Sequence, residues 1–94
     1  MVQTITRVRF AVTKSIQLEN GIALRHGAYW GVIEREGYET YQGIEWGKPH
    51  YYVDLSKEQL KRMGQPAHLT QRSLRCDLTK FVEEGSIEAV DVAG

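Results

Sequence analysis

Alternating apolar and polar residues at the start of the chain predict a β-strand over residues 2–12. Val8 and Phe10 fall on one face of this strand, whereas Arg7 and Arg9 fall on the other. Side chains of a strand point alternately to its two sides, so the pattern is typical of one buried and one solvent-exposed face. We therefore expect Val8 and Phe10 to join a core on one side of a sheet.

An Asn-Gly pair at residues 20–21 predicts a hairpin after a short strand over residues 15–19. A two-residue loop would place the aliphatic residues of the two strands on opposite faces. A three-residue loop over 19–21 keeps four aliphatic side chains on one face and sets Gly21 in the left-handed conformation. We therefore predict the longer loop. The expected cross-strand pairs are Leu18 with Ile22 and Ile16 with Leu24.

Residues 29–52 hold every tryptophan and tyrosine of the chain, together with four glycines. Aromatic residues favour pleated surfaces and glycines permit tight turns, so we expect this stretch to form the centre of an antiparallel sheet. Strands over 28–35 and 38–46 are predicted to pair around a loop of residues 35–37, because a shorter loop would bring two glutamates together. The expected cross-strand pairs are Val32 with Thr40 and Trp30 with Gln42.

A strand over residues 50–55 and then a helix are predicted next. The strand alternates apolar residues with polar ones. Ser56 is a good N-cap for the helix, and Gln59 three residues later completes a capping box. Gly64 is expected to end the helix, since Pro66 prevents its resumption.

Residues 70–84 fit two patterns. With a period of 3.6, four apolar residues form one stripe of a second helix: Leu74, Leu78, Phe81 and Val82. With a period of 2, Leu74, Cys76 and Leu78 belong to a strand that is followed by a short helix. We favour the single helix, because it needs no additional break. Residues 86–92 then return as an edge strand.

These elements predict a single α+β domain over residues 1–94: β-rich over 1–55, helical over 56–84 and ending in the edge strand. The expected architecture is an antiparallel β-meander of about five strands, with two C-terminal helices packed on one face. A small curled barrel carrying the same helices is the alternative. A chain of 94 residues is long enough to bury one core and fold alone.

Composition excludes few functions. Twelve basic and twelve acidic residues cancel, and no apolar run is long enough to span a membrane. A single cysteine excludes an internal disulfide and suits a reducing compartment, so we expect a cytoplasmic protein without membrane attachment. No metal motif, phosphate loop or nucleophile elbow is present, and we expect no cofactor. The residues that a catalytic or metal site would need are His26, His50, His68 and Cys76, at spacings typical of neither.

The aromatic stretch favours a binding function over catalysis. Tyrosine and tryptophan dominate binding hot spots, and a small sheet cannot easily bury seven large aromatic side chains on one face. We expect a non-catalytic domain that binds a protein partner or another copy of itself. The residues predicted to form its binding patch are Tyr29, Trp30, Tyr41, Trp46 and Tyr52.

Nucleic-acid binding is the alternative function. Residues 56–64 and 70–87 resemble a helix-turn-helix, and residues 77–87 are similar to the end of a winged-helix recognition helix. That resemblance implies that Arg72 and Arg75 face the nucleic acid; a solvated basic helix face is the interpretation that we favour. Bases could also stack on exposed rings of the sheet beside arginines. The candidate contacts are Arg7, Arg9, Arg25, Arg72 and Arg75.

Overall fold

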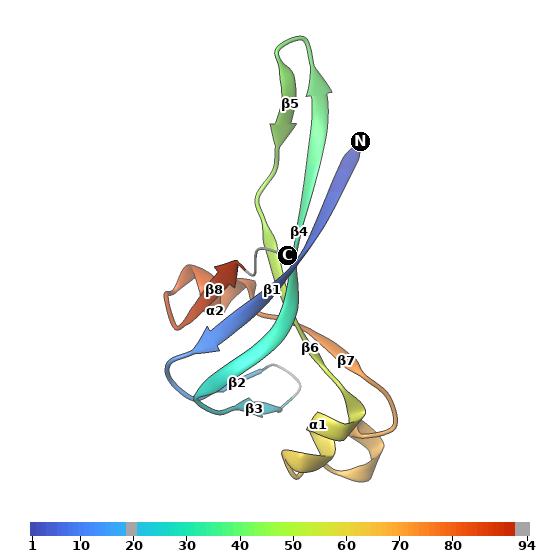
Figure 1. Ribbon diagram of the computed structural model, residues 1–94, viewed down its shortest axis with the longest axis vertical. Helices are drawn as coiled ribbons and strands as arrows, with labels where there is room; N and C mark the ends of the chain where they lie inside the picture. The colour runs from blue at the N-terminus through green and yellow to red at the C-terminus, as the bar shows by residue number, and fades with distance from the viewer. Residues whose placement is uncertain (19–20, 92–94) are drawn as a thin grey trace.

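An antiparallel sheet forms most of the protein in the computed structural model, which describes residues 1–18 and 21–91. The strands of the main sheet are β1 (Val2–Val12), β4 (Gly27–Thr40), β5 (Gly43–Trp46), β6 (His50–Leu55), β7 (Leu74–Asp77) and β8 (Ile87–Asp91). The smaller elements are β2 (Ile16–Gln17), β3 (Ala23–Leu24), α1 (Lys57–Arg62), the 3-10 helix η1 (Ala67–Leu69) and α2 (Thr79–Glu83). Figure 1 shows this arrangement.

The strand order of the main sheet is β7-β6-β4-β1-β8, with β5 pairing to the end of β4. The strands β1, β4, β6 and β7 form an antiparallel meander, as predicted in kind, although β7 lies where a helix was predicted and β2-β3 form a separate two-stranded sheet. β8 returns to the far side of β1 as the predicted edge strand. Residue 92 of that prediction lies outside the described residues. The α+β class is confirmed. Pairing within the described part of the chain leaves β7 and β8 at opposite edges, so the sheet does not close into a barrel.

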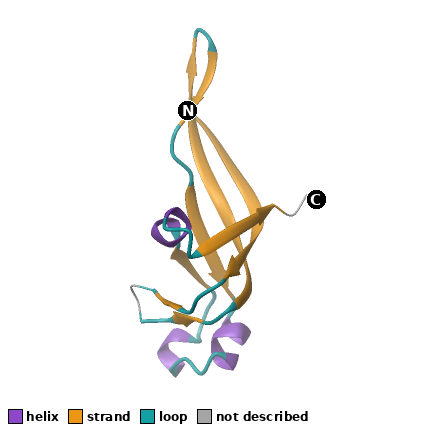
Figure 2. Ribbon diagram, turned by 90° about the vertical axis from the view of Figure 1, so that its left-hand side faces the viewer, coloured by secondary structure: helices purple, strands orange, loops and turns teal. Residues whose placement is uncertain are grey.

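One face of the sheet carries the core. Phe10 of β1 and Leu55 of β6 are fully buried there. The first hairpin, α1 and the N-cap residue of α2 add side chains to the same cluster, since Leu24, Leu60 and Leu78 are fully buried with them. Figure 2 shows α2 and the small β2-β3 sheet to one side of the long strands, and α1 with η1 at the lower end of the molecule. The opposite side of the sheet, which we call the open face, is left uncovered by these elements.

The predicted hairpin around Gly21 is confirmed by its register. Ile16 pairs with Leu24, and the Leu18 N–H donates to the Ile22 carbonyl at 2.8 Å. Gly21 has a φ of +84°, the left-handed conformation that the three-residue loop requires. The other two loop residues, 19 and 20, lie outside the described residues.

The turn predicted at residues 35–37 is wrong. Strand β4 continues through Gly37 to Thr40, because the eleven-residue β1 pairs with it along its length up to the Val2–Gly37 pair. The hairpin turns instead at residues 41–42, where the Thr40 hydroxyl donates to the Gly43 carbonyl at 2.8 Å. The expected cross-strand pairs are therefore wrong as well. The observed pairs are Val32 with Arg7 and Tyr52, and Trp30 with Arg9.

The single helix predicted over residues 70–84 is also wrong, and the strand followed by a short helix is observed. Strand β7 pairs with β6, and its Cys76 lies opposite the fully buried Val53. Strand β7 ends at Asp77. The Asp77 carboxylate accepts a hydrogen bond from the Thr79 N–H at 2.8 Å, at the start of α2. Because the second helix of a helix-turn-helix is replaced by a strand, the resemblance to that motif does not hold.

The first helix is confirmed. It begins after Ser56, whose hydroxyl accepts the Gln59 N–H at 3.1 Å. The chain leaves the helix through Gly64, which has a φ of +77°. Ser56 joins the end of β6 to α1 and lines one side of the pocket described below.

The β4-β5 hairpin extends beyond the core and makes the molecule long and narrow, 51 × 27 × 26 Å. Figure 1 shows this hairpin projecting from the body of the sheet. We call residues 36–47 the arm, because the Gly47 N–H donates to the Glu36 carbonyl at 2.8 Å and closes the hairpin at its base. Past Gly37 the arm is a two-stranded ribbon.

Candidate functional site

The open face carries an exposed tryptophan with two arginines over its ring. Arg9 lies directly opposite Trp30 in the β1-β4 pair, and Arg7 lies one open-face position further along β1. Their guanidinium carbons lie 5.1 and 4.6 Å from the centre of the indole ring. Both distances are within the range of cation–π attraction. We call these three residues the Trp30 site; the tryptophan itself remains 37% exposed.

A third arginine, Arg75, lies on the same face but is already paired with acidic residues. Arg75 of β7 donates to both carboxylate oxygens of Asp54, from Nε at 2.7 Å and from Nη2 at 3.2 Å. Its Nη1 lies 3.6 Å from a Glu34 carboxylate oxygen. The hydrogen bond that Arg75 donates to Asp54 raises the pKa of Arg75 above its usual value. Since all three side chains are partly exposed, the ion pairs orient Arg75 more than they stabilise the fold.

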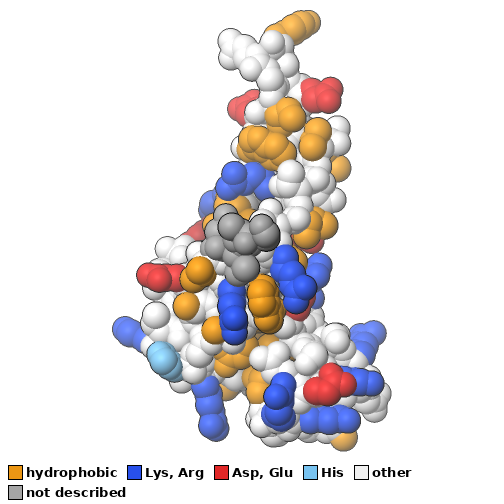
Figure 3. Space-filling view, viewed as in Figure 1, with side chains coloured by type: hydrophobic (Ala, Val, Ile, Leu, Met, Phe, Trp, Pro, Cys, Tyr) orange, Lys and Arg blue, Asp and Glu red, His pale blue; other side chains and the backbone are white. Residues whose placement is uncertain are grey.

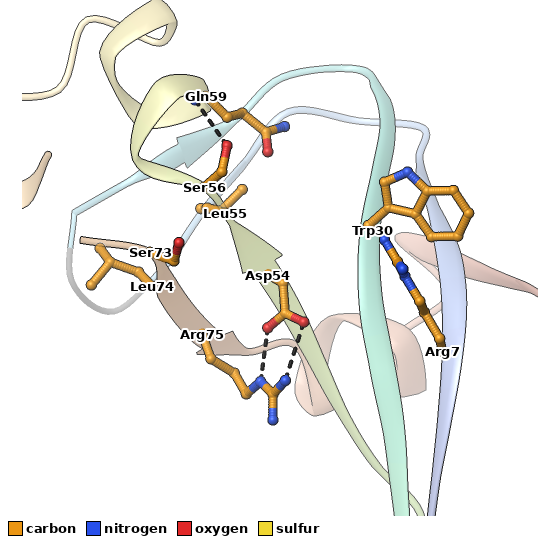
Figure 4. A pocket seen from close by; sticks show the side chains of 9 residues that line it. All are labelled: Arg7, Trp30, Asp54, Leu55, Ser56, Gln59, Ser73, Leu74 and Arg75. Carbon is orange, nitrogen blue, oxygen red and sulfur yellow. Dashed lines mark hydrogen bonds and ion pairs between the residues drawn. The ribbon is translucent and has the colours of Figure 1, made fainter.

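A pocket of about 560 Å³ lies between the Trp30 site and the start of α1. Figure 4 shows Arg7 and Trp30 on one side of it and Ser56, Gln59 and Ser73 on another. Asp54 and Arg75 close a third side, where their opposite charges cancel. The lining therefore combines the Trp30 indole, the aliphatic side chains of Leu55 and Leu74, neutral hydroxyl and amide groups, and the Arg7 guanidinium beside the Asp54–Arg75 ion pair. This chemistry suits the docking of a polar or acidic side chain beside an aromatic one.

Tyr52 occupies the open face between Val32 and Asp77. Desolvation raises the pKa of its phenol above the usual value of 10.0, and the carboxylates of Asp77 and Glu34 raise it further. The phenolate is therefore disfavoured in the folded protein.

We expect Tyr52→Phe to reduce the loss of stability above pH 10. A pKa that is raised by folding contributes stability below the unfolded value and loses it as the pH rises through the folded value. The wild-type minus variant absorbance difference should titrate with a midpoint above 10. A midpoint at or below 10 would contradict the burial of this phenol.

The arm exposes large apolar side chains. Tyr41 at its turn is fully exposed, and about half of each of three further side chains is exposed: Tyr38, Ile44 and Trp46. Figure 3 shows hydrophobic side chains gathered along this part of the molecule, with acidic side chains beside them. Residues 36–47 contain three glutamates and no basic residue. The arm is thus both aromatic and acidic.

A glycine sets the packing on one side of the arm. A Cβ atom at Gly37 would lie 2.6 Å from Ile44 Cγ2 and 2.8 Å from Trp46 Cε3. The two β5 side chains therefore lie across the bare backbone of β4. Sequence reasoning took this glycine for a turn, although a glycine between strands also signals a close approach of side chains.

The five aromatic residues predicted as one patch are divided between three places. Trp30 and Tyr52 lie on the open face, whereas Tyr41 and Trp46 lie on the arm. Tyr29 packs against the core, and its hydroxyl donates to the Arg25 carbonyl at 2.9 Å. Tyr38 and Ile44 join the arm surface without having been predicted. A turn at residues 41–42 would have placed both side chains near an exposed hairpin end. The turn predicted at residues 35–37 placed them within the sheet instead.

The five predicted arginines are likewise divided. Arg7 and Arg9 meet at Trp30, and Arg75 lies on the same face with its acidic partners. Arg25 lines a different pocket, next to Tyr29 and Arg62. Arg72 lies in the exposed segment before β7.

The part of the chain that the structure describes contains no group of three histidine, cysteine or acidic residues that could hold a metal ion. Across the same residues, no helix has the length and apolar character needed to cross a membrane. The candidate site thus consists of exposed aromatic and charged side chains on an antiparallel sheet. Comparisons of this chain with protein-family models, curated proteins and solved structures find no match.

Proposed function

We propose that the protein is a non-catalytic binding domain whose arm engages a protein partner or a second copy of the chain. The observation that carries this proposal is the exposure of Tyr38, Tyr41, Ile44 and Trp46 on one projecting hairpin. Tyrosine and tryptophan provide large contact areas with few rotatable bonds, which makes them frequent hot-spot residues. Ile44 and Trp46 lie on one side of this ribbon and Tyr38 on the other, so the arm exposes apolar side chains on both sides, which favours association in water.

The arm is held in place before any partner binds. Strand β4 runs from the body into the arm, and the Gly47–Glu36 hydrogen bond closes its base. Just beyond it, the Lys48 ammonium lies 2.9 Å from a Glu83 carboxylate oxygen of α2. A preformed surface loses less conformational entropy on binding than a flexible loop. These contacts therefore support a role in recognition.

The chemistry of the arm indicates the kind of surface it would bind. Its three glutamates lie beside the exposed rings without any basic residue in residues 36–47. A basic surface with an apolar centre would match both the charge and the rings, whereas an acidic surface would be repelled. We place this interaction in the cytoplasm, where the single cysteine of the chain, Cys76, would stay reduced.

Nucleic-acid binding is a second candidate, and the Trp30 site is the observation that favours it. An exposed indole with two guanidinium groups could stack a base and contact phosphates. Carboxylates of Asp54, Glu34 and Asp77 lie on the same face and would oppose a polyanion. Steep loss of affinity for single-stranded nucleic acid with rising salt, removed by Arg7→Gln with Arg9→Gln, would favour this candidate over the first.

Cross-linking from the arm tests the proposed function. A photo-reactive phenylalanine analogue replaces Tyr41 in cells that naturally make the protein, and irradiated products are separated by mass. We expect a discrete adduct whose yield falls about tenfold or more when Trp46→Ala and Tyr38→Ala are added, because hot-spot side chains carry most of the binding energy.

The matched controls use the same chemistry elsewhere. The analogue at exposed His68 of η1 should give no such adduct, and Gln42→Ala at the arm tip should leave the adduct yield unchanged. An adduct of twice the chain mass would identify a second copy, and any other mass a different protein partner. Equal products from positions 41 and 68, or no product from 41, would overturn the proposal.

A further inference from the structure

A second pocket, of about 320 Å³, lies where the end of α1 meets the segment between β3 and β4. Arg62 lines it from α1 and Arg25 lines it from that segment, while Tyr29 and Met63 add apolar surface to its wall. None of the described residues that line it is acidic, in contrast with the first pocket, which Asp54 lines. Pockets that bind small ligands have volumes of about 300–1,000 Å³. We call this one the Arg25 pocket.

Both guanidinium groups of the Arg25 pocket are exposed and have no acidic partner among the described residues. Glu58 lies one turn before Arg62 on α1, but these two described side chains form no ion pair. Arg75 on the open face differs, since two carboxylates already hold it. Two positive charges in one pocket are therefore available to a ligand.

Backbone hydrogen bonds hold both sides of the Arg25 pocket in place. The Tyr29 hydroxyl donates to the Arg25 carbonyl at 2.9 Å and ties the segment to β4. At the end of α1, the N–H groups of residues 63–65 donate to the carbonyls of residues 59–61. Carbonyls at the end of a helix carry partial negative charge, which would repel an anion if they were left without donors. These bonds thus make the site preformed and also less unfavourable to a negative charge.

The part of the protein around the Arg25 pocket is basic, although the whole chain has equal numbers of basic and acidic residues. Residues 56–73, which we call the basic lobe, include α1 and η1. Figure 3 shows Lys and Arg side chains gathered at the lower end of the molecule, where α1 lies in Figure 1. A local excess of one charge attracts ligands of the opposite charge. The exposed basic residues of the lobe are Lys57, Lys61, Arg62 and Arg72, and its one acidic residue is Glu58.

We infer that the Arg25 pocket binds the phosphate group of a small phosphorylated molecule, held by Arg25 and Arg62 together. A phosphate monoester carries about 1.5 to 2 negative charges at pH 7, which matches two guanidinium groups. The planar guanidinium fork also fits the spacing of phosphate oxygens. A carboxylate carries one charge and would leave one arginine without a partner. Tyr29 and Met63 would contact the apolar part of the ligand.

The test uses phenyl phosphate as the ligand and nuclear magnetic resonance of nitrogen-15-labelled protein. The Nε–Hε signals of Arg25 and Arg62 report binding at the pocket itself. We expect both signals to shift to saturation as phenyl phosphate is added. Arg25→Gln and Arg62→Gln should each weaken binding at least about tenfold, because each removes hydrogen bonds to a charged group. Phenyl sulfate, which has the same ring and one negative charge, should bind more weakly than phenyl phosphate.

A neighbouring lysine provides the matched control. Lys61→Gln removes one positive charge next to Arg62 but outside the pocket lining, and should change the affinity by less than about twofold. Far-ultraviolet circular dichroism should show that all three variants keep the wild-type fold, since the substituted side chains are exposed.

The outcomes separate a built site from general attraction of anions. Shifts that do not saturate, or an equal loss of affinity in Lys61→Gln and Arg62→Gln, would overturn the inference. A phosphoserine peptide or a single-stranded oligonucleotide that binds at least about tenfold more tightly than phenyl phosphate would also overturn it, because contacts outside the pocket would then dominate. This site does not involve the arm, so the cross-linking result at Tyr41 is independent of it.

Discussion

Replacing Gly31 by alanine is expected to prevent stable folding. Gly31 lies at the centre of β4, between Val8 of β1 and Val53 of β6. A Cβ atom there would overlap the backbone carbonyl oxygen of Tyr52 and the ring of Phe10. A clash with backbone cannot be relieved by a change of rotamer, so β6 would have to move away from β4. Overpacking typically costs about 1–3 kcal/mol and occasionally more, and a clash with the backbone places Gly31→Ala at the upper end of this range or above it.

Urea unfolding, followed by tryptophan fluorescence, measures this effect. Small domains have unfolding free energies of about 5–15 kcal/mol, so the variant should unfold at far lower urea concentration or be unfolded without it. Gly47→Ala is the matched control. Its Cβ would meet only the Glu36 carbonyl oxygen at 3.4 Å, and we expect a change of less than about 1 kcal/mol. A Gly31→Ala protein as stable as the wild type would contradict the close approach of β4 and β6.

Phe10→Ala is expected to have the second largest effect, a loss of about 3–5 kcal/mol of unfolding free energy. Phe10 is fully buried, and its ring meets that of Tyr51 edge to face at 6.3 Å. Its ring fills the space beside Gly31, which has no side chain of its own to occupy it. Truncation would therefore leave a cavity at the middle of the core.

The same unfolding measurement distinguishes a cavity from a general weakening of β1. Thr4→Ala, an exposed position on the same strand, should change stability by less than about 1 kcal/mol. Adding Phe10→Ala to Gly31→Ala should not restore folding, because the clash with the Tyr52 carbonyl remains. Rescue by the double substitution, or an effect of Phe10→Ala no larger than that of Thr4→Ala, would contradict this packing.

The first hairpin and α1 could be predicted from the sequence, because several neighbouring residues favour the same local structure in each. In the first hairpin, four aliphatic side chains share a face in only one of the two loop lengths considered, and that register is observed. At α1, the N-cap Ser56 and the positive φ of Gly64 at the helix end do not depend on contacts with distant parts of the chain. Both predictions depended on residues close together in sequence.

The errors arose where one signal has two structural meanings. Gly37 was taken for a turn, but its role is to let Ile44 and Trp46 lie across β4. Leu74 and Leu78 satisfy both a helical and a strand period, and pairing of β7 with β6 decided between them. That pairing is a long-range contact, which no local pattern in residues 70–84 contains.

The candidate site was predictable in its residue types but not in its arrangement. Alternation in β1 correctly put Arg7 and Arg9 on the face away from the core. Their convergence on Trp30 depends on the β1-β4 register, across more than twenty positions of sequence. The misplaced turn had set Trp30 opposite Gln42, so the two halves of the Trp30 site were never brought together.

Strand β4 belongs to the core and to the arm at once, and this ties the alignment of one to the other. A shift of β4 by a single residue would turn Trp30 into the space that Phe10 and Gly31 share, and would expose core residues in exchange. The packing of the core therefore fixes the register of β4 in the arm as well. It determines which side chains the tip exposes, although none of these side chains is itself buried. Substitutions at Tyr38, Tyr41, Ile44 or Trp46 would change the surface that the arm exposes, while Gly31 and Phe10 keep its alignment unchanged.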